Sequence, residues 1–493
     1  MQTLDLRITN ARLIDGSGGA STLGGLAVAD DRIFALGDVS AYRGGREIDA
    51  GGLALAPGFI DSHTHDDRAL LVNPTMDCKV SQGVTSVVTG NCGISLAPLD
   101  LKGRPPAPLD LLSPDPQDFF ADFSAYLERL DSDPAATNAL CQVGHSSLRV
   151  AAMESLERPA DAGEIRAMRR ALEASLAAGA MGFSTGLGYA PATAAPTEEI
   201  VALAGALAEA PGGCGLHTTH MRDEGDRIAE ALTESFAIGR AAKVPLVISH
   251  FKCHGAQNLG RSRETLSLLD AARSGQSVGL DVYPYDASST VLEAGYIAEA
   301  GRIVVTWSDP HPEMSGRDLS DIAAEWGVER LDAAERLQPA GAIYFMMDEA
   351  DVRRILTYPH SMIGSDGLPH DRHPHPRLWG SFPRVLGHYA RDEGLFSLEE
   401  AVRKMTGLTA DTFGLTDRGR LAPGQAADLV LFDPATVADL ATFERPCQAA
   451  AGIREVWVNG RSVWREGAAT GARPGRAIRR QSLSLSHQGI GTS

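Results

Sequence analysis

The sequence predicts an α/β fold whose centre is a (β/α)8 barrel similar to a TIM barrel. Short apolar, strand-like runs alternate with helix-like segments over about 300 residues, and polar residues gather at the ends of those runs. A chain of 493 residues with 43% hydrophobic content can also bury a large core. The expected barrel strands are residues 58–65, 84–93, 141–145, 180–186, 215–220, 244–250, 277–285 and 361–366.

The segments between the predicted strands have the apolar spacing of helices. One face of residues 161–179 carries Ile165, Met168, Leu172 and Leu176. Asp161 stands where it can cap the N-terminus of this helix, and residues 197–213 and 263–275 show the same periodicity. Strands and helices in alternation favour a parallel barrel with its active site at the C-terminal ends of the strands.

Residues that bind metals or transfer protons stand at these strand ends. In chain order they are His63, His65, Cys92, His145, His217, His220, His250, Tyr283 and Asp366. Side chains two residues apart on a strand point the same way, so the H-x-H pair of residues 63–65 can converge on one ion. For His145 or His217 alone, a satisfied polar residue near the core is the favoured interpretation. Together, histidine, thiolate and carboxylate are zinc ligands and predict a metal site.

Composition excludes several functional classes. The formal net charge of −18 argues against a nucleic-acid or membrane partner, since either needs a basic face. We find no signal-peptide pattern, and no apolar run approaches the ~18 residues of a membrane span. The cysteines are irregularly spaced, which favours reduced thiols in the cytoplasm. Apart from Cys92 they are expected to be small buried side chains, namely Cys78, Cys141, Cys214, Cys253 and Cys447.

Seven motifs resemble a known enzyme group. They are "PGFIDSHTHDD", "TSVVTGNCGIS", "HTTHMRDEGD", "VISHFKC", "DVYPYDASST", "IGSDGLPHD" and "HPHPRLWGSFPRVLG". Together they resemble the N-acyl-D-amino-acid deacylase (D-aminoacylase) branch of the amidohydrolase superfamily, from about residue 5 to about residue 465. Most members of that superfamily bridge their metals with a carboxylated lysine or a glutamate, whereas this branch uses a cysteine. The fourth predicted strand carries only Ser184 and Thr185 near its end, so the resemblance implies that Cys92 takes the bridging role.

The resemblance implies a zinc centre and the residues that form it. One tightly held zinc would be bound by Cys92, His220 and His250. His63 and His65 would contribute to a second, weaker position near Asp366, with Cys92 able to bridge. Zinc lowers the pKa of its bound water towards about 7 and polarises the amide carbonyl, while Asp366 acts as general base and returns the proton to the departing amine. The alternative for Asp366 is a helix N-cap.

The resemblance also implies how the substrate is bound. Arg377, Lys252, Tyr283 and Ser289 match the residues that hold the substrate α-carboxylate in the family. An arginine suits this role because its planar fork meets a carboxylate with two parallel hydrogen bonds. The alternatives are a surface salt bridge for Arg377, a solvated loop for Lys252 and core packing for Tyr283.

The connection at about residues 288–348 is much longer than a usual βα loop and resembles the family's lid over the active site. Members specific for acyl-D-glutamate carry arginines in this lid, and their positions fall on Tyr296 and Val304 here, with Arg302 offset. This favours apolar side chains over D-glutamate.

The two ends of the chain resemble the superfamily's small β-sandwich domain. Residues 1–55 and 416–466 would form it around a barrel of residues 56–415, leaving a weakly ordered tail at 467–493. An Asn459-Gly460 pair predicts a hairpin.

The predicted activity is zinc-dependent hydrolysis of N-acyl-D-amino acids, small molecules that would be the protein's partners. One rival is another metal-dependent amidohydrolase, such as a dihydroorotase, a hydantoinase or an N-acyl-D-glutamate deacylase. A cyclic-amide hydrolase would require the bridging lysine that is missing here. The other rival is a catalytically inactive barrel scaffold, which would be expected to lose ligands. The oligomeric state, monomer or small homo-oligomer, stays open.

Overall fold

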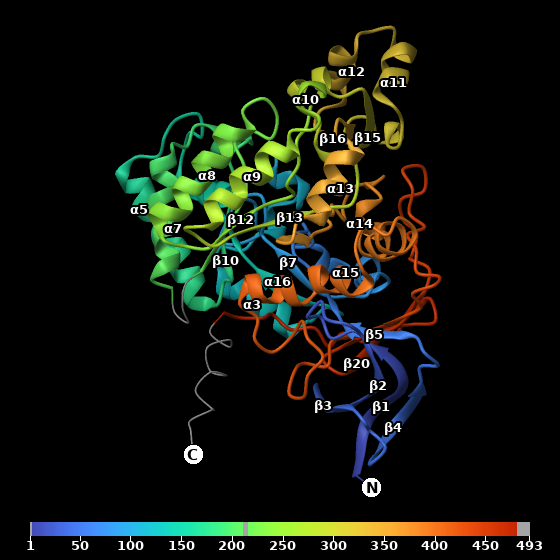
Figure 1. Cartoon of the computed structure of the whole chain (residues 1–493). Coiled ribbons are helices and arrows are strands. Elements are labelled where there is room, and N and C mark those ends of the chain that lie inside the picture. The colour runs from blue at the N-terminus through green and yellow to red at the C-terminus, as the bar shows by residue number, and fades with distance from the viewer. Residues whose placement is uncertain (1, 211–214, 481–493) are drawn as a thin grey trace.

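The computed structural model describes residues 2–210 and 215–480 (Figure 1). Its central strands are β6 (Phe59–Asp61), β7 (Val84–Thr89), β8 (Asn138–Cys141), β9 (Val143–Gly144), β10 (Gly182–Gly186), β11 (Leu216–His220), β12 (Leu246–Ile248), β13 (Val278–Val282) and β17 (Ser361–Ile363). Parallel pairing runs in the orders β6-β7-β8 and β9-β10-β11-β12-β13-β17. β8 and β9 are consecutive parts of one strand, separated by a single residue.

Backbone hydrogen bonds close these strands into the predicted barrel. Between β8 and β9, the Gln142 amide donates to the Thr89 carbonyl at 3.0 Å, which continues the pairing with β7. At the seam between β17 and β6, the Ser62 amide donates to the Ile363 carbonyl at 3.3 Å. Beyond the strand ends, the Asp366 amide donates to the His63 carbonyl at 2.7 Å. The predicted α/β barrel is confirmed.

Helices cover the outside of the barrel (Figure 1). They are α1 (Ala69–Val72), α2 (Asp77–Val80), α3 (Phe123–Ser132), α4 (His145–Ala152), α5 (Ala162–Ala178), α6 (Ala190–Thr193), α7 (Thr197–Ala208), α8 (Ile228–Ala242), α9 (Ser262–Arg273), α13 (Glu349–Thr357), α14 (Arg377–Arg384), α15 (Leu398–Met405) and α16 (Gly407–Phe413). Asp161 caps α5 as predicted, because its side chain accepts hydrogen bonds from the amides of Gly163 and Glu164.

Apolar side chains from several barrel strands meet in one buried cluster. Ile60, Val88, Leu140, Leu216, Val247 and Met362 belong to it. Phe413 from α16 and Ile478 from the C-terminal segment complete this cluster. With the core filled in this way, the polar side chains collect at the C-terminal ends of the strands.

Strands from both ends of the chain form one nine-stranded sheet, which lies away from α10, α11 and α12 in Figure 1. They are β1 (Gln2–Leu13), β2 (Thr22–Ala29), β3 (Arg32–Gly37), β4 (Tyr42–Asp49), β5 (Ala54–Pro57), β18 (Leu429–Phe432), β19 (Ile453–Val458), β20 (Arg461–Arg465) and β21 (Ala468–Ala469). The order is β21-β20-β19-β18-β5-β1-β2-β3, with β4 paired to β1. Asn459 and Gly460, both at positive φ, form the predicted hairpin between β19 and β20. The exact limits of a separate domain stay a prediction.

The chain continues in ordered contacts beyond residue 466, where the composition predicts a weakly ordered tail. Ala468 and Ala469 form β21, and Ala477 pairs in parallel with Ala139 of β8. The Ile478 amide donates to the Ala139 carbonyl at 2.8 Å, and the Ile478 side chain is buried. This burial and pairing outweigh the polar composition, so the predicted start of the tail at residue 467 is wrong. Residues 481–493 lie outside the described part.

Between β13 and β17 the chain forms a separate small layer. It contains β14 (Ala287–Val291), α10 (Ala294–Glu299), β15 (Arg302–Ser308), α11 (Leu319–Trp326), α12 (Arg330–Leu337) and β16 (Ala340–Phe345). The strands pair antiparallel in the order β14-β16-β15, and the layer has its own apolar core. We call residues 287–345 the insert. Its contacts with the barrel include a 3.0 Å hydrogen bond between the Tyr189 and Thr290 hydroxyls.

Candidate metal centre and active site

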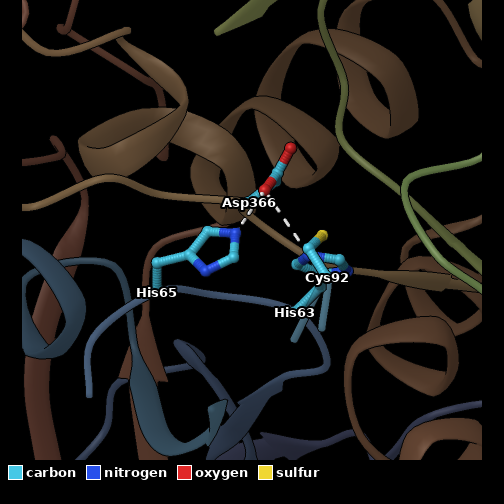
Figure 2. A group of neighbouring side chains, drawn as sticks. All are labelled: His63, His65, Cys92 and Asp366. Carbon is cyan, nitrogen blue, oxygen red and sulfur yellow. Dashed lines mark hydrogen bonds and ion pairs between the residues drawn. The ribbon is translucent and has the colours of Figure 1, made fainter. Parts of the chain in front are cut away.

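Two groups of metal-binding side chains meet at the C-terminal ends of the barrel strands. One contains His63, His65, Cys92 and Asp366 (Figure 2), and the other contains Cys92, His220 and His250. Within each group the possible ligand atoms lie within 4.8 Å of one another, and all the side chains are buried. The structure therefore brings together the residues predicted for metal binding and proton transfer, with Cys92 common to both groups.

Three of these residues have an unusual backbone conformation. Cys92, His250 and Asp366 have φ values of 53°, 35° and 49°, in the left-handed region that non-glycine residues seldom occupy. Such strain persists only where surrounding structure enforces it, and it is common at functional sites. At Cys92 the loop lies against Gly186 at the end of β10, where a Cβ atom would collide with the Cys92 carbonyl. This close approach accounts for a glycine at that strand end.

Cys92 lies between two imidazoles. Its Sγ is 3.3 Å from His63 Nε2 and 3.2 Å from His250 Nε2. Burial alone would raise the pKa of this thiol, but the positive charges on His63 and His250 hold the pKa well below its usual value. The sulfur is therefore an anionic thiolate, the form that binds metals.

Asp366 is also held as an anion. Its Oδ1 lies 3.2 Å from His65 Nε2 and 3.4 Å from His63 Nε2, contacts drawn in Figure 2. Its Oδ2 lies 2.9 Å from Arg377 Nη1. Burial raises the pKa of this carboxyl, and the charge of Arg377 with the hydrogen bond from His65 lowers it well below the usual range.

The donor set fits a zinc ion. A thiolate, imidazole nitrogens and a carboxylate are its usual protein ligands. Two further carboxylates contact the outer nitrogens of ligand imidazoles: Asp281 Oδ1 is 3.1 Å from His63 Nδ1, and Glu224 Oε1 is 3.1 Å from His250 Nδ1. Such contacts fix the ring orientation and tautomer of metal-binding histidines.

Asp281 and Glu224 were not singled out from the sequence. Asp281 lies on β13, two residues before the predicted Tyr283, and also accepts the His250 amide at 2.7 Å. Glu224 follows His220 by four residues. Their only sequence signal is a carboxylate close to a predicted site residue, which many exposed acidic residues share.

His145 and His217 do not join either metal group among the described residues. His145 starts α4, and its Nε2 lies 2.9 Å from Glu199 Oε1. His217 Nε2 lies 3.0 Å from the Thr185 hydroxyl, and burial lowers the pKa of His217 to about 3, so its ring is neutral. Both are buried side chains that bond through Nε2, while their Nδ1 atoms have no hydrogen-bond partner among the described residues.

The four residues predicted to hold the substrate form a cluster that reaches Asp366 through Arg377. Arg377 is fully buried at the start of α14, where Nη2 donates to the Ser289 carbonyl at 3.0 Å and the guanidinium stands 4.5 Å from the Tyr283 ring centre. Lys252 Nζ lies 2.6 Å from Glu224 Oε2 and 6.0 Å from that same ring centre. The buried Ser289 hydroxyl has no hydrogen-bond partner among the residues that the structure describes. The cluster is therefore buried and rich in donors, and each of its cations faces a carboxylate, Arg377 facing Asp366 and Lys252 facing Glu224.

The other cysteines differ from Cys92. Cys78, Cys141 and Cys253 are buried free thiols, as expected, and burial raises the pKa of each. Cys447 is exposed, so the expectation of burial is wrong there, because the residue lies in the loop between β18 and β19 rather than in an element. Cys214 lies outside the described residues.

Comparison with known proteins places the chain in a family. The model of the amidohydrolase family matches residues 46–292 and 309–464. A D-aminoacylase of Alcaligenes xylosoxydans xylosoxydans is 57% identical over 479 residues, which cover 97% of this chain and 98% of that protein. An N-acyl-D-aspartate deacylase of the same organism is 52% identical, over 96% of this chain and 95% of its own.

Among solved structures, an N-acyl-D-glutamate deacylase of Bordetella bronchiseptica, complexed with zinc and a phosphonate inhibitor, superimposes with a TM-score of 0.93. It is 48% identical, and the match covers 97% of this chain and all of that one. The chain belongs to the amidohydrolase family. Its predicted resemblance to the D-aminoacylase branch is confirmed by the identity over nearly the whole length. None of the helices in the two described ranges has the length and apolarity needed to span a bilayer.

Proposed function

We propose that this protein hydrolyses the amide bond of N-acyl-D-amino acids, releasing a carboxylate and a free D-amino acid, with zinc as its metal. The observation that carries the proposal is the buried cluster of thiolate, imidazoles and Asp366, next to the cations Arg377 and Lys252. Two relatives that match over nearly their whole length, a D-aminoacylase and an N-acyl-D-aspartate deacylase, support the same substrate class. The D configuration rests on these relatives, because no residue type indicates handedness.

Cys92, His220 and His250 would hold the tight metal, and His63, His65 and Asp366 the weaker one. The bound ion would lower the pKa of a water molecule towards about 7 and polarise the scissile carbonyl. Asp366 then accepts a proton from the attacking water. It returns this proton to the nitrogen of the departing amine as the carbon–nitrogen bond breaks, since the amine is a poor leaving group as an anion.

Arg377 holds Asp366 on one side and reaches towards the insert on the other. Together with Lys252, Tyr283 and the unpaired hydroxyl of Ser289, it would bind the α-carboxylate of the substrate. The guanidinium fork presents parallel donors, which suits a planar carboxylate. Anchoring this end of the substrate fixes the amide beside Asp366, so a substrate lacking the carboxylate would be poorly oriented.

We further propose that the side-chain pocket prefers apolar groups to carboxylates. A cavity of about 150 Å³ borders His220 and is lined by Tyr296, Glu293 and Glu299 of the insert. The basic side chains Arg222 and His254 in its wall already have partners: Arg222 is paired with Glu234 at 2.9 Å, and His254 Nδ1 lies 2.9 Å from Glu299 Oε2.

The two other positions considered from the sequence also offer no free cation. Arg302 is half-exposed, 3.5 Å from Asp318 and 4.8 Å from the Phe345 ring centre. Val304 is buried with Ala287 and Ile343. A substrate carboxylate buried here would lack a partner, which costs ~1–3 kcal/mol, or roughly 10-fold to 150-fold in kcat/KM.

The test is an assay of the purified, zinc-loaded protein against N-acetyl derivatives of D- and L-amino acids. We expect hydrolysis of the D-leucine, D-methionine and D-phenylalanine derivatives, and a lower kcat/KM for N-acetyl-D-glutamate. Absence of turnover on the whole panel would contradict the activity and favour the scaffold. A glutamate preference that disappears in Arg302→Ala would instead contradict the proposed pocket.

The reduced cysteines are consistent with action in the cytoplasm, which we propose as the compartment.

A further inference from the structure

A lysine is fully buried next to the first metal group, where the mechanism above assigns it no role. Lys79 of α2 has no exposed surface. Its Nζ donates to Asp61 Oδ2 at 2.8 Å, Thr64 Oγ1 at 3.0 Å and Ser365 Oγ at 2.8 Å, and it lies 3.3 Å from Asp66 Oδ2. All these partners are buried.

The partners of Lys79 belong to two chain segments 300 residues apart in sequence, and both carry site residues. Thr64 stands between His63 and His65, and Ser365 immediately precedes Asp366. Asp61 also joins the segments, because it accepts the Ser365 amide at 2.8 Å and the Ser365 hydroxyl at 2.6 Å. A single ammonium group therefore connects the H-x-H pair to the segment that carries Asp366.

This connection lies at the seam where the barrel closes. β17 and β6 are not joined by a paired ladder in the described structure. Three backbone bonds cross the seam beyond β6: Ser62 to Ile363 at 3.3 Å, Asp366 to His63 at 2.7 Å, and His65 to Gly367 at 3.0 Å. Side chains of the Lys79 cluster add polar contacts to these backbone bonds. They lie next to Asp366, whose left-handed backbone must be enforced by its surroundings.

Burying a lysine is costly unless its charge and all its donors are satisfied, and apolar residues often stabilise such a position as well or better. Stability alone therefore does not account for an ammonium here. An apolar residue donates no hydrogen bonds. It therefore cannot fix Asp61, Thr64 and Ser365 at hydrogen-bond distances, as the three donors of the ammonium do.

We propose that Lys79 is a positioning residue that sets the geometry of His63, His65 and Asp366 as one unit. The inference rests on the proposed hydrolysis for its kinetic consequence and on the two proposed zinc positions for its consequence for metal binding. Lys79 contacts neither His220 nor His250, so its loss should affect the weaker metal position and the orientation of Asp366, and spare the tight position.

The test compares three variants. Lys79→Met removes the ammonium. Ser365→Ala keeps the ammonium but removes the hydroxyl that accepts from Lys79 and donates to Asp61. It tests the same connection if Lys79→Met does not fold. Lys404→Met is the matched control. Lys404 is equally buried but donates to the Tyr358 carbonyl at 2.6 Å and the Ser361 hydroxyl at 3.1 Å, at the start of β17 and away from the site.

Zinc binding is measured against graded chelator, and kcat and KM are measured on N-acetyl-D-leucine. In Lys79→Met and Ser365→Ala we expect the tight equivalent to remain, the affinity of the second to fall at least ~10-fold, and kcat to fall ~10-fold with KM changed less than ~2-fold. Lys404→Met should leave two quantities unchanged. They are the ratio of the zinc affinities of the two metal positions, and kcat calculated per folded molecule.

Unchanged affinities and kcat in both site variants would overturn the proposal. Equal loss of both metals and of the folded fraction would also overturn it, since that pattern indicates a purely structural lysine. If the wild-type protein binds only one equivalent of zinc, the kinetic result tests the proposal. A fall in kcat with little change in KM then supports it, and an unchanged kcat contradicts it. If it hydrolyses no N-acyl amino acid, the proposed function fails, and the ratio of metal affinities still tests Lys79.

Discussion

Cys92 is the residue on which both metal groups depend. Its thiolate contacts His63 on one side and His250 on the other. We expect Cys92→Ala to fold but to lose the tight zinc and turnover together, because alanine offers no ligand atom and removes the negative charge that a cation requires. Metal analysis and the hydrolysis assay check this outcome.

A buried thiol elsewhere provides the control. Cys141 on β8 is equally buried, and burial raises the pKa of its thiol to about 12, so it is neutral. Cys141→Ala should retain zinc and activity. A full equivalent of zinc and normal turnover in Cys92→Ala would contradict the assigned role.

Asp366 is the candidate general base. Asp366→Asn keeps the shape and the contact with Arg377 in part, but an amide cannot accept the proton from water. We expect the tight zinc to remain and kcat to fall at least ~100-fold, the usual scale for loss of general acid–base help. Measurement of kcat beside the metal content checks this, and a near-normal rate would refute the role.

The sequence identified metal-binding residue types at strand ends but could not rank them. His145 and His217 follow the same pattern as His220 and His250, yet they contact Glu199 and Thr185 instead. Which side a strand-end histidine faces depends on the bend of the chain after the strand, and at His250 that bend is a left-handed residue. Lys79 was not identifiable because its partners come from the end of β6 and from the segments that follow β6 and β17, and only closure of the barrel brings them together.

At the scale of elements, the insert shows why the sequence alone could not identify the residues that line the side-chain pocket. The sequence could not decide whether Arg302 turns towards the active site. β15 pairs with β16, and a register shift between Val305 and Trp307 interrupts the regular alternation of its faces. Arg302 precedes this shift and pairs with Phe345 in regular register, and its side chain lies against Phe345 and Asp318, outside the cavity next to His220.

Two helices beside the barrel are joined by a buried ion pair. Glu199 of α7 accepts from Arg149 Nη1 of α4 at 2.6 Å and from the Ala160 amide at 3.1 Å, and its Oε1 lies 2.9 Å from His145 Nε2. Burial raises the pKa of Glu199, but the hydrogen bonds from His145 and Arg149 lower it to about 2. In the unfolded chain this pKa returns to about 4.3.

A carboxyl whose pKa is lower in the folded state stabilises the fold above its unfolded pKa. This contribution, of order 3 kcal/mol, is lost as the pH falls from about 4.5 towards 2. We expect Glu199→Gln to be less stable than wild type at pH 7, with the difference shrinking between pH 5 and pH 3. Apparent melting temperatures across that range check this prediction. Glu198→Gln, on the exposed side of α7, is the control. If the difference in melting temperature between Glu199→Gln and wild type is as large at pH 3 as at pH 7, the role of Glu199 is contradicted.

At the scale of the whole molecule, the order of the strands was predictable and the path of the C-terminal end was not. Alternating strands and helices determine the barrel, because parallel strands require crossover helices. Residues 467–480 have a polar composition, yet Ile478 reaches the cluster that contains Ile60 and Leu140. One buried isoleucine with paired backbone leaves too weak a pattern to be detected in a single sequence.

The proposed metal ligands come from the ends of β6, β7, β11, β12 and β17, so an ion bound to them would connect strands around much of the barrel. An ion that binds only the folded chain stabilises it by RT ln(1 + [L]/Kd), which is ~2.7 kcal/mol when free zinc is 100-fold above Kd. For a chain of this length that corresponds to a rise of roughly 3 °C in apparent melting temperature. We expect chelator to lower the melting temperature of the wild-type protein by this amount and added zinc to restore it.

Cys92→Ala distinguishes this effect from zinc bound elsewhere. Without the shared thiolate, its melting temperature should respond to neither chelator nor zinc, whereas Cys141→Ala should respond as wild type does. All scans are compared at one heating rate, because unfolding of a chain this large is often irreversible. An equal response in Cys92→Ala and wild type would place the stabilising ion outside the two groups at the barrel mouth.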